Sequence, residues 1–105
     1  MKKLLTLTTF FLFSQVSNAF YTGNDLRIKC NEIRGSFDRG ECNGFVAGVV
    51  EARSETLICL PPGVTLGQIT EIIKKYINEN PAQLHKTADE IVTKAVAKDF
   101  PCKKR

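Results

Sequence analysis

Apolar residues recur at intervals of three and four along most of the chain, which is the spacing of helices that bury one face. Four helices are predicted on this basis, at about 23–33, at about 37–52, from residue 66 and from residue 81. The positions expected to face the core are, in chain order, Leu26, Cys30, Ile33, Cys42, Phe45, Val46, Val49, Val50, Leu66, Ile69, Ile72, Ile73, Tyr76, Ile77, Leu84, Ala88, Ile91, Val92, Ala95 and Val96. No strand of any length is predicted.

Polar residues mark where these helices begin. Thr22 and Thr65 each open the pattern of a capping box. Ser36 can cap the second helix, and Asn80 followed by Pro81 fits the start of the fourth. Because the connections are short, neighbouring helices should run antiparallel. The sequence therefore predicts a small all-α domain of four helices.

The second helix carries Gly40, Gly44 and Gly48 at four-residue spacing. Each glycine inside a helix costs roughly 1 kcal/mol relative to alanine, so three on one stripe need a reason. One interpretation is the close approach of another helix backbone in the same fold. The other is a flat docking strip for a partner or for a second copy of the chain.

The first nineteen residues have the parts of a secretory signal peptide. Lys2-Lys3 precedes an apolar run over 4–13, and Ser17-Asn18-Ala19 provides a small-x-small exit. The run is too short for the roughly 20 apolar residues of a membrane span. We expect cleavage after Ala19, which leaves residues 20–105 as a domain outside the cytoplasm and without stable membrane insertion.

Four cysteines in an exported domain are candidates for disulfides, and they permit three pairings. In an up-down arrangement, the end of the first helix lies near the start of the second, and the end of the fourth lies near the start of the third. This geometry favours Cys30–Cys42 and Cys59–Cys102, although the sequence alone does not choose among the pairings. Each bridge is expected to contribute roughly 2–4 kcal/mol to a small domain.

The composition offers little for catalysis. The formal charge of +4 falls to +2 without Lys2 and Lys3, and no RNA-binding aromatic motif is present, so nucleic acid is not an expected partner. There is no Cys-x-x-Cys, and His85 is the only histidine, for which a structural role is expected. We therefore predict no metal, no cofactor and no enzymatic activity.

A set of motifs spread over residues 23–102 resembles the Rap/Tai family of immunity proteins. The matching elements are Gly23-Asn24-Asp25-Leu26, Cys30, Arg39-Gly40-x-Cys42-x-Gly44-Phe45-Val46-x-Gly48-Val49, Cys59-x-Pro61, Gly63-Val64-Thr65-x-x-Gln68, Tyr76, Pro81-x-x-Leu84-His85, Ala88 and Phe100-Pro101-Cys102. The resemblance implies an all-helical periplasmic protein that inhibits a peptidoglycan amidase effector of a type VI secretion system. Such amidases are cysteine peptidases, and some members of the family act as homodimers.

The motifs that carry the resemblance are framework positions, so they transfer no contact residue. From the sequence itself, the expected contact surface is the polar connector after the second helix, which comprises Glu51, Arg53, Ser54, Glu55 and Thr56. A loop that is anchored at both ends loses less entropy on binding, and Cys59 would supply the second anchor. Exchange of Glu55 or Arg53 for alanine should then weaken inhibition without lowering thermal stability. The alternative is an ordinary solvated loop.

Two other functions are compatible with a small, disulfide-stapled helical domain of the envelope. One is a chaperone of the acid-stress type, which would expose apolar surface when its carboxylates are protonated. The other is an envelope binding module without an amidase partner. Dye binding at low pH would distinguish the first, and the genes beside this one would distinguish the second.

Overall fold

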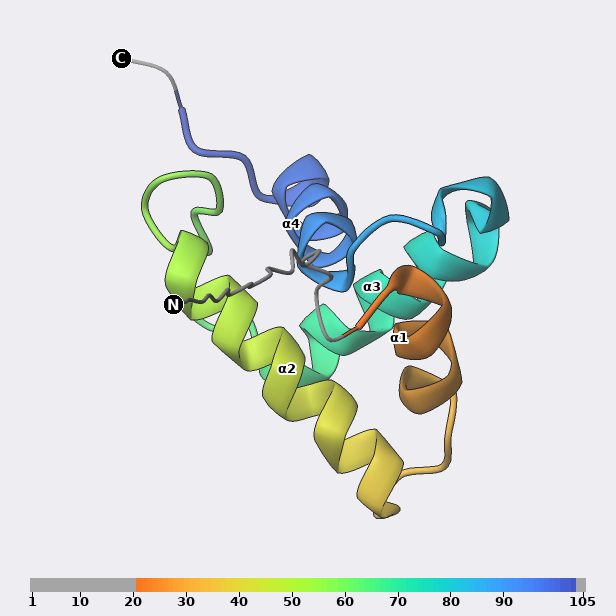
Figure 1. The fold of residues 1–105 in the computed structure, drawn as a ribbon. Coiled ribbons are helices and arrows are strands. Elements are labelled where there is room, and N and C mark those ends of the chain that lie inside the picture. The colour runs from red at the N-terminus through yellow and green to blue at the C-terminus, as the bar shows by residue number, and fades with distance from the viewer. Residues whose placement is uncertain (1–20, 104–105) are drawn as a thin grey trace, which may run out of the picture.

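The computed structural model describes residues 21–103, and their fold is all-α, as predicted (Figure 1). Its elements are α1 (Gly23–Cys30), α2 (Phe37–Arg53), α3 (Leu66–Glu79), the 3₁₀ helix η1 (Pro81–Gln83) and α4 (Ala88–Asp99). Only isolated β-bridges, and no strands, occur within this part of the chain. The predicted signal peptide over 1–19 and its cleavage site after Ala19 lie outside the described residues.

The predicted start signals of three helices are confirmed. Thr22 and Thr65 form complete capping boxes, in which side-chain oxygens of Asp25 and Gln68 accept hydrogen bonds from the backbone N–H groups of the two cap residues. The hydroxyl of Ser36 accepts a hydrogen bond of 3.1 Å from the backbone N–H of Arg39 at the start of α2. These helix starts could be predicted from the sequence because each cap depends on residues only three positions apart.

The first helix ends at Cys30 rather than at Ile33. The backbone N–H of Asn31 closes the helix, and the chain then turns back through Gly35, whose φ is +88°. Ile33 lies in this turn and is 75% exposed, so its predicted place in the core is wrong. The turn is needed here because Cys30 must meet Cys42 on α2.

The fourth helix begins at Ala88, seven residues later than predicted. Asn80 does not cap with its side chain, which donates to the carbonyl of Tyr76 instead. The carbonyls of Leu84 and Lys86 accept the backbone N–H groups of Asn24 and Gly23, both at 2.9 Å. A helix through residues 84–87 would use those carbonyls for its own bonds. The pairing with the start of α1 therefore replaces the first two turns of the predicted helix.

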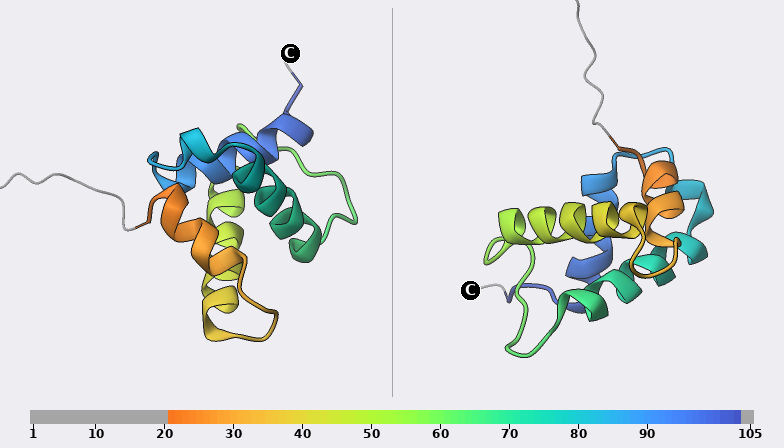
Figure 2. Two further views of the ribbon diagram at one scale, coloured as in Figure 1. Left: turned by 90° about the vertical axis from the view of Figure 1, so that its right-hand side faces the viewer. Right: turned by 90° about the horizontal axis from the view of Figure 1, so that it is seen from below.

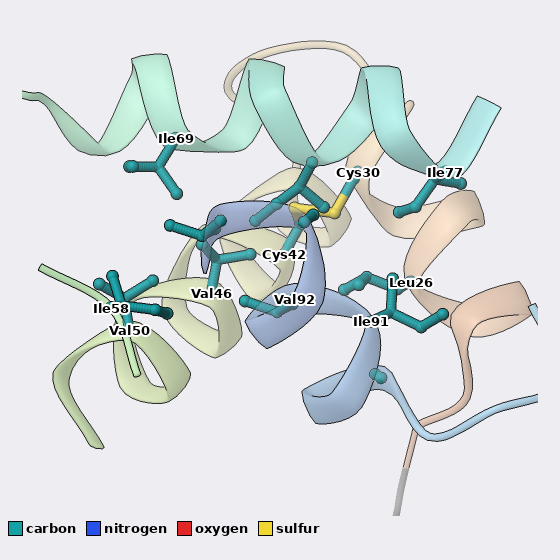
Figure 3. Packing of buried hydrophobic residues seen from close by; sticks show 14 of the residues in the cluster. Leu26, Cys30, Cys42, Val46, Val50, Ile58, Ile69, Ile77, Ile91 and Val92 are labelled. Atoms are coloured by element: carbon teal, nitrogen blue, oxygen red, sulfur yellow. A yellow bond between two sulfur atoms is a disulfide. The ribbon is translucent and has the colours of Figure 1, made fainter. Parts of the chain in front are cut away.

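The four helices enclose one hydrophobic core (Figure 3). In Figure 3, Ile69 of α3 lies over Val46 of α2, and Ile77 at the other end of α3 lies over Leu26 of α1. The helices do not form an aligned antiparallel bundle: in the right view of Figure 2, both α1 and α4 run across the direction of α2. Of the predicted core residues, Leu66 is 41% exposed, because it is the first residue of α3 and lies at the edge of the core.

Both favoured disulfides are present in the structure. Cys30–Cys42 joins the end of α1 to α2, and its two residues are fully buried. Cys59–Cys102 joins the connector before α3 to the segment after α4, and its two residues are partly exposed. The first bridge thus belongs to the core, whereas the second fastens two peripheral segments to each other.

The glycines of α2 do not serve the close approach of another helix. Gly40, Gly44 and Gly48 are exposed, and a Cβ atom added at any of them would meet no atom within 4 Å. The intramolecular interpretation of this stripe is therefore wrong. Within residues 21–103 the three glycines lower the stability of α2 without a packing gain in return.

Replacement of Gly44 by alanine is expected to stabilise the monomer by about 1 kcal/mol. The new methyl group has open space, and alanine loses less conformational freedom when the helix forms. Thermal unfolding at low protein concentration should show a rise of about 4–8 °C in the melting temperature. A fall in that temperature would contradict the open surface described above.

Candidate binding surface

The connector after α2 folds into a tight loop over residues 54–58. The carbonyl of Arg53 accepts backbone hydrogen bonds from Thr56, Leu57 and Ile58 at 3.0–3.2 Å, and Thr56 Oγ1 adds another at 3.0 Å. The N–H of Glu55 donates to the carbonyl of Ile58 at 2.9 Å. Glu55 has a φ of +68°, a left-handed conformation that costs a residue with a side chain roughly 1–3 kcal/mol. The loop thus has one defined shape, and it holds backbone strain at Glu55.

The downstream end of the loop is fixed to the end of α4. Ile58 is fully buried and forms a bridge with Pro101. The backbone N–H of Cys59 donates to the carbonyl of Phe100 at 3.0 Å, and the disulfide to Cys102 follows directly. The disulfide anchor was predicted from the sequence, and a buried side chain and a backbone hydrogen bond lie beside it in the structure.

Between these anchors the loop presents both polar and apolar side chains. Glu51 at the end of α2 is exposed, as are Ser54, Glu55 and Thr56. Leu57 is 53% exposed at the same place. Leu57 was not among the predicted contact residues, because the run Leu57-Ile58-Cys59-Leu60 does not indicate which apolar side chain points outward.

Arg53, one of the predicted contact residues, also makes contacts within the fold. Its Nε donates to Thr93 Oγ1 at 3.3 Å, and a terminal guanidinium nitrogen lies 3.1 Å from Asp89 Oδ2. Thr87 holds the other oxygen of Asp89 with a hydrogen bond of 2.8 Å. Arg53 therefore ties the start of the loop to α4. An Arg53→Ala variant would move the loop as well as remove a charge, so it is a poor probe of binding.

A hollow of about 480 Å³ lies beside the loop, between Leu57 and the outer face of α4. Its lining consists of Arg53, Leu57, Thr87, Asp89, Glu90, Thr93, Lys94 and Ala97. Leu57 and Ala97 give it an apolar part, and the ion pair of Arg53 with Asp89 borders it. An apolar side chain surrounded by a charged and polar rim is an arrangement found in protein-binding surfaces.

The titratable groups whose pKa values are shifted do not lie in the loop over 54–58 but where α1 and the residue before Thr22 meet α2. Lys29 Nζ is 2.6 Å from Glu41 Oε1, and the Tyr21 hydroxyl donates to the other oxygen of Glu41 at 3.1 Å. The hydrogen bond from Lys29 lowers the pKa of Glu41, and the same bond raises the pKa of Lys29. Burial, and then the bond to Glu41, raise the pKa of Tyr21. The shifts of Lys29 and Glu41 both favour the charged forms of these two residues, as in an ion pair that stabilises the fold.

The fold should therefore lose stability when Glu41 is protonated. Because its pKa in the folded chain lies below its ordinary value of 4.5, ionised Glu41 stabilises the fold above that pH. This contribution disappears as pH falls through the lowered pKa. Urea unfolding at a series of pH values should show a shallower loss of stability on acidification for Glu41→Gln than for the parent chain. Identical slopes would mean that the ion pair contributes nothing.

The described residues contain no group of side chains able to hold a metal ion. All four cysteines are in disulfides, and residues 21–103 hold no cluster of three histidine, cysteine, aspartate or glutamate side chains able to bind a metal. His85, for which a structural role was predicted, lies in the turn between η1 and α4 and is exposed, so it is not packed in the core. No helix in this part of the chain is long and apolar enough to cross a membrane.

Comparison with known families gives one match. The model of a family described as Rap1a immunity proteins matches residues 22–102, a range that includes all four helices and both disulfides. A search of curated proteins gives no match. The range begins at the capping threonine of α1 and ends at the second cysteine of the second bridge.

Proposed function

The chain belongs to the Rap1a immunity protein family, and we propose that it binds and inhibits a peptidoglycan amidase effector of a type VI secretion system. The family match along residues 22–102 is the observation that carries this proposal. An immunity protein acts by binding its cognate effector. The inhibition we propose is stoichiometric, and no chemical step is assigned to the chain itself.

We place this activity in the periplasm. Two disulfides form and persist in oxidising compartments, and the N-terminal segment has the pattern of a signal peptide that would be cleaved after Ala19. Peptidoglycan, the substrate of the proposed effector, is also in that compartment. The functional unit would then be residues 20–105.

The surface we assign to the amidase is the loop over 54–58 together with the hollow beside it. The loop is held at both ends, so little conformational entropy is lost when a partner contacts it. Leu57 supplies an apolar anchor at its tip, and Glu55 supplies a charge next to it. A protruding loop of this kind fits a cleft. We therefore propose that it covers the active-site cleft of a cysteine peptidase.

The proposal is tested first by capture of the partner. Oxidised, purified residues 20–105 would be used in a pull-down from periplasmic extract, with bound proteins identified by mass spectrometry. We expect a cysteine amidase whose cleavage of peptidoglycan stops when the purified chain is added. An amidase that is bound but still active would contradict inhibition. Recovery of many unrelated envelope proteins, above all after acid treatment, would favour the chaperone function instead.

Replacement of Leu57 by aspartate is expected to weaken inhibition of that amidase about 10–100-fold, which corresponds to about 1.4–2.8 kcal/mol. The change places a charge where an apolar contact is proposed. Because Leu57 is exposed, the melting temperature should stay unchanged. Inhibition would be measured as amidase activity against the concentration of each variant.

Two further variants make the comparison specific. Leu66→Asp is the matched control, because Leu66 is also an exposed leucine but lines a separate hollow between α2 and α3. Glu55→Gly removes the carboxylate and suits the positive φ at that position, so it keeps the shape of the loop. If Leu57→Asp and Leu66→Asp inhibit equally well, the loop is not the contact surface.

A further inference from the structure

The two disulfides differ in how easily another molecule can reach them. Cys30 and Cys42 are both 0% exposed, so a thiol can reach their bridge only when the core opens. Cys59 and Cys102 are partly exposed, and Pro101 beside them is exposed. Because a thiolate must approach one sulfur atom directly, the rate of thiol–disulfide exchange depends on access. The second bridge is therefore the one open to chemical attack.

The accessible bridge is also the main link between the connector and the end of α4. It joins segments that are 43 positions apart in the sequence. Beside it, the two segments share a hydrogen bond of 3.0 Å from the N–H of Cys59 to the carbonyl of Phe100, and the bridge between Ile58 and Pro101. When the disulfide is broken, these contacts alone hold the downstream end of the loop over 54–58.

We propose that Cys59–Cys102 is a site of thiol–disulfide exchange with dithiols, and that its reduction releases the loop and weakens binding of the effector. A thiolate of the dithiol attacks one sulfur of the bridge and forms a mixed disulfide, and the other cysteine leaves as a thiolate. The second thiolate of the dithiol then breaks the mixed disulfide. The dithiol ends as a disulfide, and its two protons pass through solvent to Cys59 and Cys102, which end as thiols.

A carboxylate lies directly beside this bridge. Oε1 of Glu55 is 3.9 Å from Sγ of Cys59. If a thiolate attacks Cys59, the entering negative charge approaches this carboxylate. If the thiolate attacks Cys102, Cys59 is the leaving group and the negative charge develops on its own sulfur. Like charges repel by either route, so Glu55 should slow the reduction of the bridge.

The backbone conformation of Glu55 fits this role. Its φ of +68° is one that glycine adopts without strain and that costs a residue with a side chain. Glycine would therefore suit the backbone here but would leave no carboxylate beside the sulfur. A strained residue whose side chain lies against the accessible disulfide supports a role for that side chain.

This reactivity links the shape of the loop to the redox state of the surroundings. The bridge persists in an oxidising compartment and opens where dithiols are present. The effect on binding rests on the proposed function, because it requires that the loop contacts the amidase. The exchange itself concerns the free chain, so it can be measured without any partner.

The first test is reduction of oxidised residues 20–105, which include the whole described fold, by dithiothreitol. Free thiols are trapped with iodoacetamide and located by peptide mapping. We expect Cys59 and Cys102 to be labelled at least about tenfold faster than Cys30 and Cys42. A reduced protein of the Cys-x-x-Cys type, used in place of dithiothreitol, distinguishes a protein dithiol from a small one. Labelling of all four cysteines at one rate would overturn the proposal.

The same assay tests the carboxylate. Glu55→Gln should speed reduction of Cys59–Cys102 by about 3–10-fold, since it removes a charge about 4 Å from the sulfur. The matched control is Glu32→Gln, which removes an exposed carboxylate before the start of α2, whereas the loop follows its end. The 17 residues of α2 span about 25 Å, well beyond the screening length of about 8–10 Å. Equal rates for Glu55→Gln and Glu32→Gln would overturn the role of Glu55.

A second measurement concerns the effector. Chain reduced and alkylated at Cys59 and Cys102, freed of both reagents because the proposed amidase uses a cysteine, should inhibit at least about tenfold more weakly than oxidised chain. Cys59→Ser with Cys102→Ser, which has neither bridge nor label, should show the same loss. Equal inhibition by all three forms would overturn the effect on binding and leave the proposed function intact. An oxidised chain that inhibits no amidase would contradict the proposed function, and with it the effect on binding.

Discussion

A chain with both Cys59→Ala and Cys102→Ala is expected to melt about 20 °C below the parent chain. The bridge closes a loop with a sequence separation of 43 residues, which corresponds to about 4 kcal/mol in the chain-entropy model. In a domain of this size, each kcal/mol lowers the melting temperature by about 4–8 °C. Since small domains are stable by only about 5–15 kcal/mol, the loss is a large fraction of the total.

Calorimetry would measure the melting temperature, and hydrogen exchange would locate the effect. Without the bridge, the amides of Thr56, Leu57 and Cys59 should exchange faster, because their hydrogen bonds lie in the two segments that it joins. The matched control is the removal of Cys30–Cys42. Its sequence separation of 12 corresponds to a loss of about 3 kcal/mol in the chain-entropy model, and removal of these two buried side chains also leaves a cavity in the core. A drop of less than 5 °C for the first variant, with loop amides still protected, would contradict this account.

The second large effect is expected from Gly23→Ala, which should destabilise the fold by about 1–3 kcal/mol and lower its melting temperature by about 5–20 °C. A Cβ atom at Gly23 would lie 2.9 Å from the Cα atom and 3.0 Å from the carbonyl oxygen of Leu84. Backbone atoms cannot rotate away as a side chain can. The start of α1 would therefore have to move away from residues 84–86.

That movement would strain the two hydrogen bonds that the start of α1 makes with Leu84 and Lys86. Thermal unfolding followed by circular dichroism would measure the effect. Gly44→Ala is the internal control, because the same chemical change in an open position should raise the melting temperature. A Gly23→Ala variant as stable as the parent would show that the contact with Leu84 is looser than described.

The elements that sequence predicted best are those set by neighbouring residues. The capping boxes at Thr22 and Thr65 and the apolar stripe of α4 depend on residues within a few positions of each other. The start of α4 was wrong because it depends on hydrogen bonds from residues 23 and 24, about sixty positions away in the chain. Ile33 was misplaced because α1 ends at Cys30 and the chain turns back through Gly35 before α2, which helix periodicity does not reveal.

For the candidate surface too, features set by neighbouring residues were predictable and features set by distant contacts were not. The loop was found from its position between the end of α2 and Cys59, a pattern visible in the sequence. The outward direction of Leu57 and the ion pair of Arg53 with Asp89 were not predictable, since both depend on how α4 lies against α2. The exposure of the three glycines of α2 was likewise not predictable. The sequence shows that glycines weaken a helix, but only the fold shows that no other helix packs against them.

The positions of the two disulfides in the chain also determine the order in which they can form during synthesis. Cys30–Cys42 closes within α1 and α2, so it needs no later part of the chain, whereas α3 and α4 both lie between Cys59 and Cys102. A chain that emerges from its N-terminus can therefore complete the first bridge while the second still lacks a partner. The shape of the loop over 54–58 is thus locked only at the last covalent step. A half-emerged chain would have its helical hairpin in place but no finished binding loop.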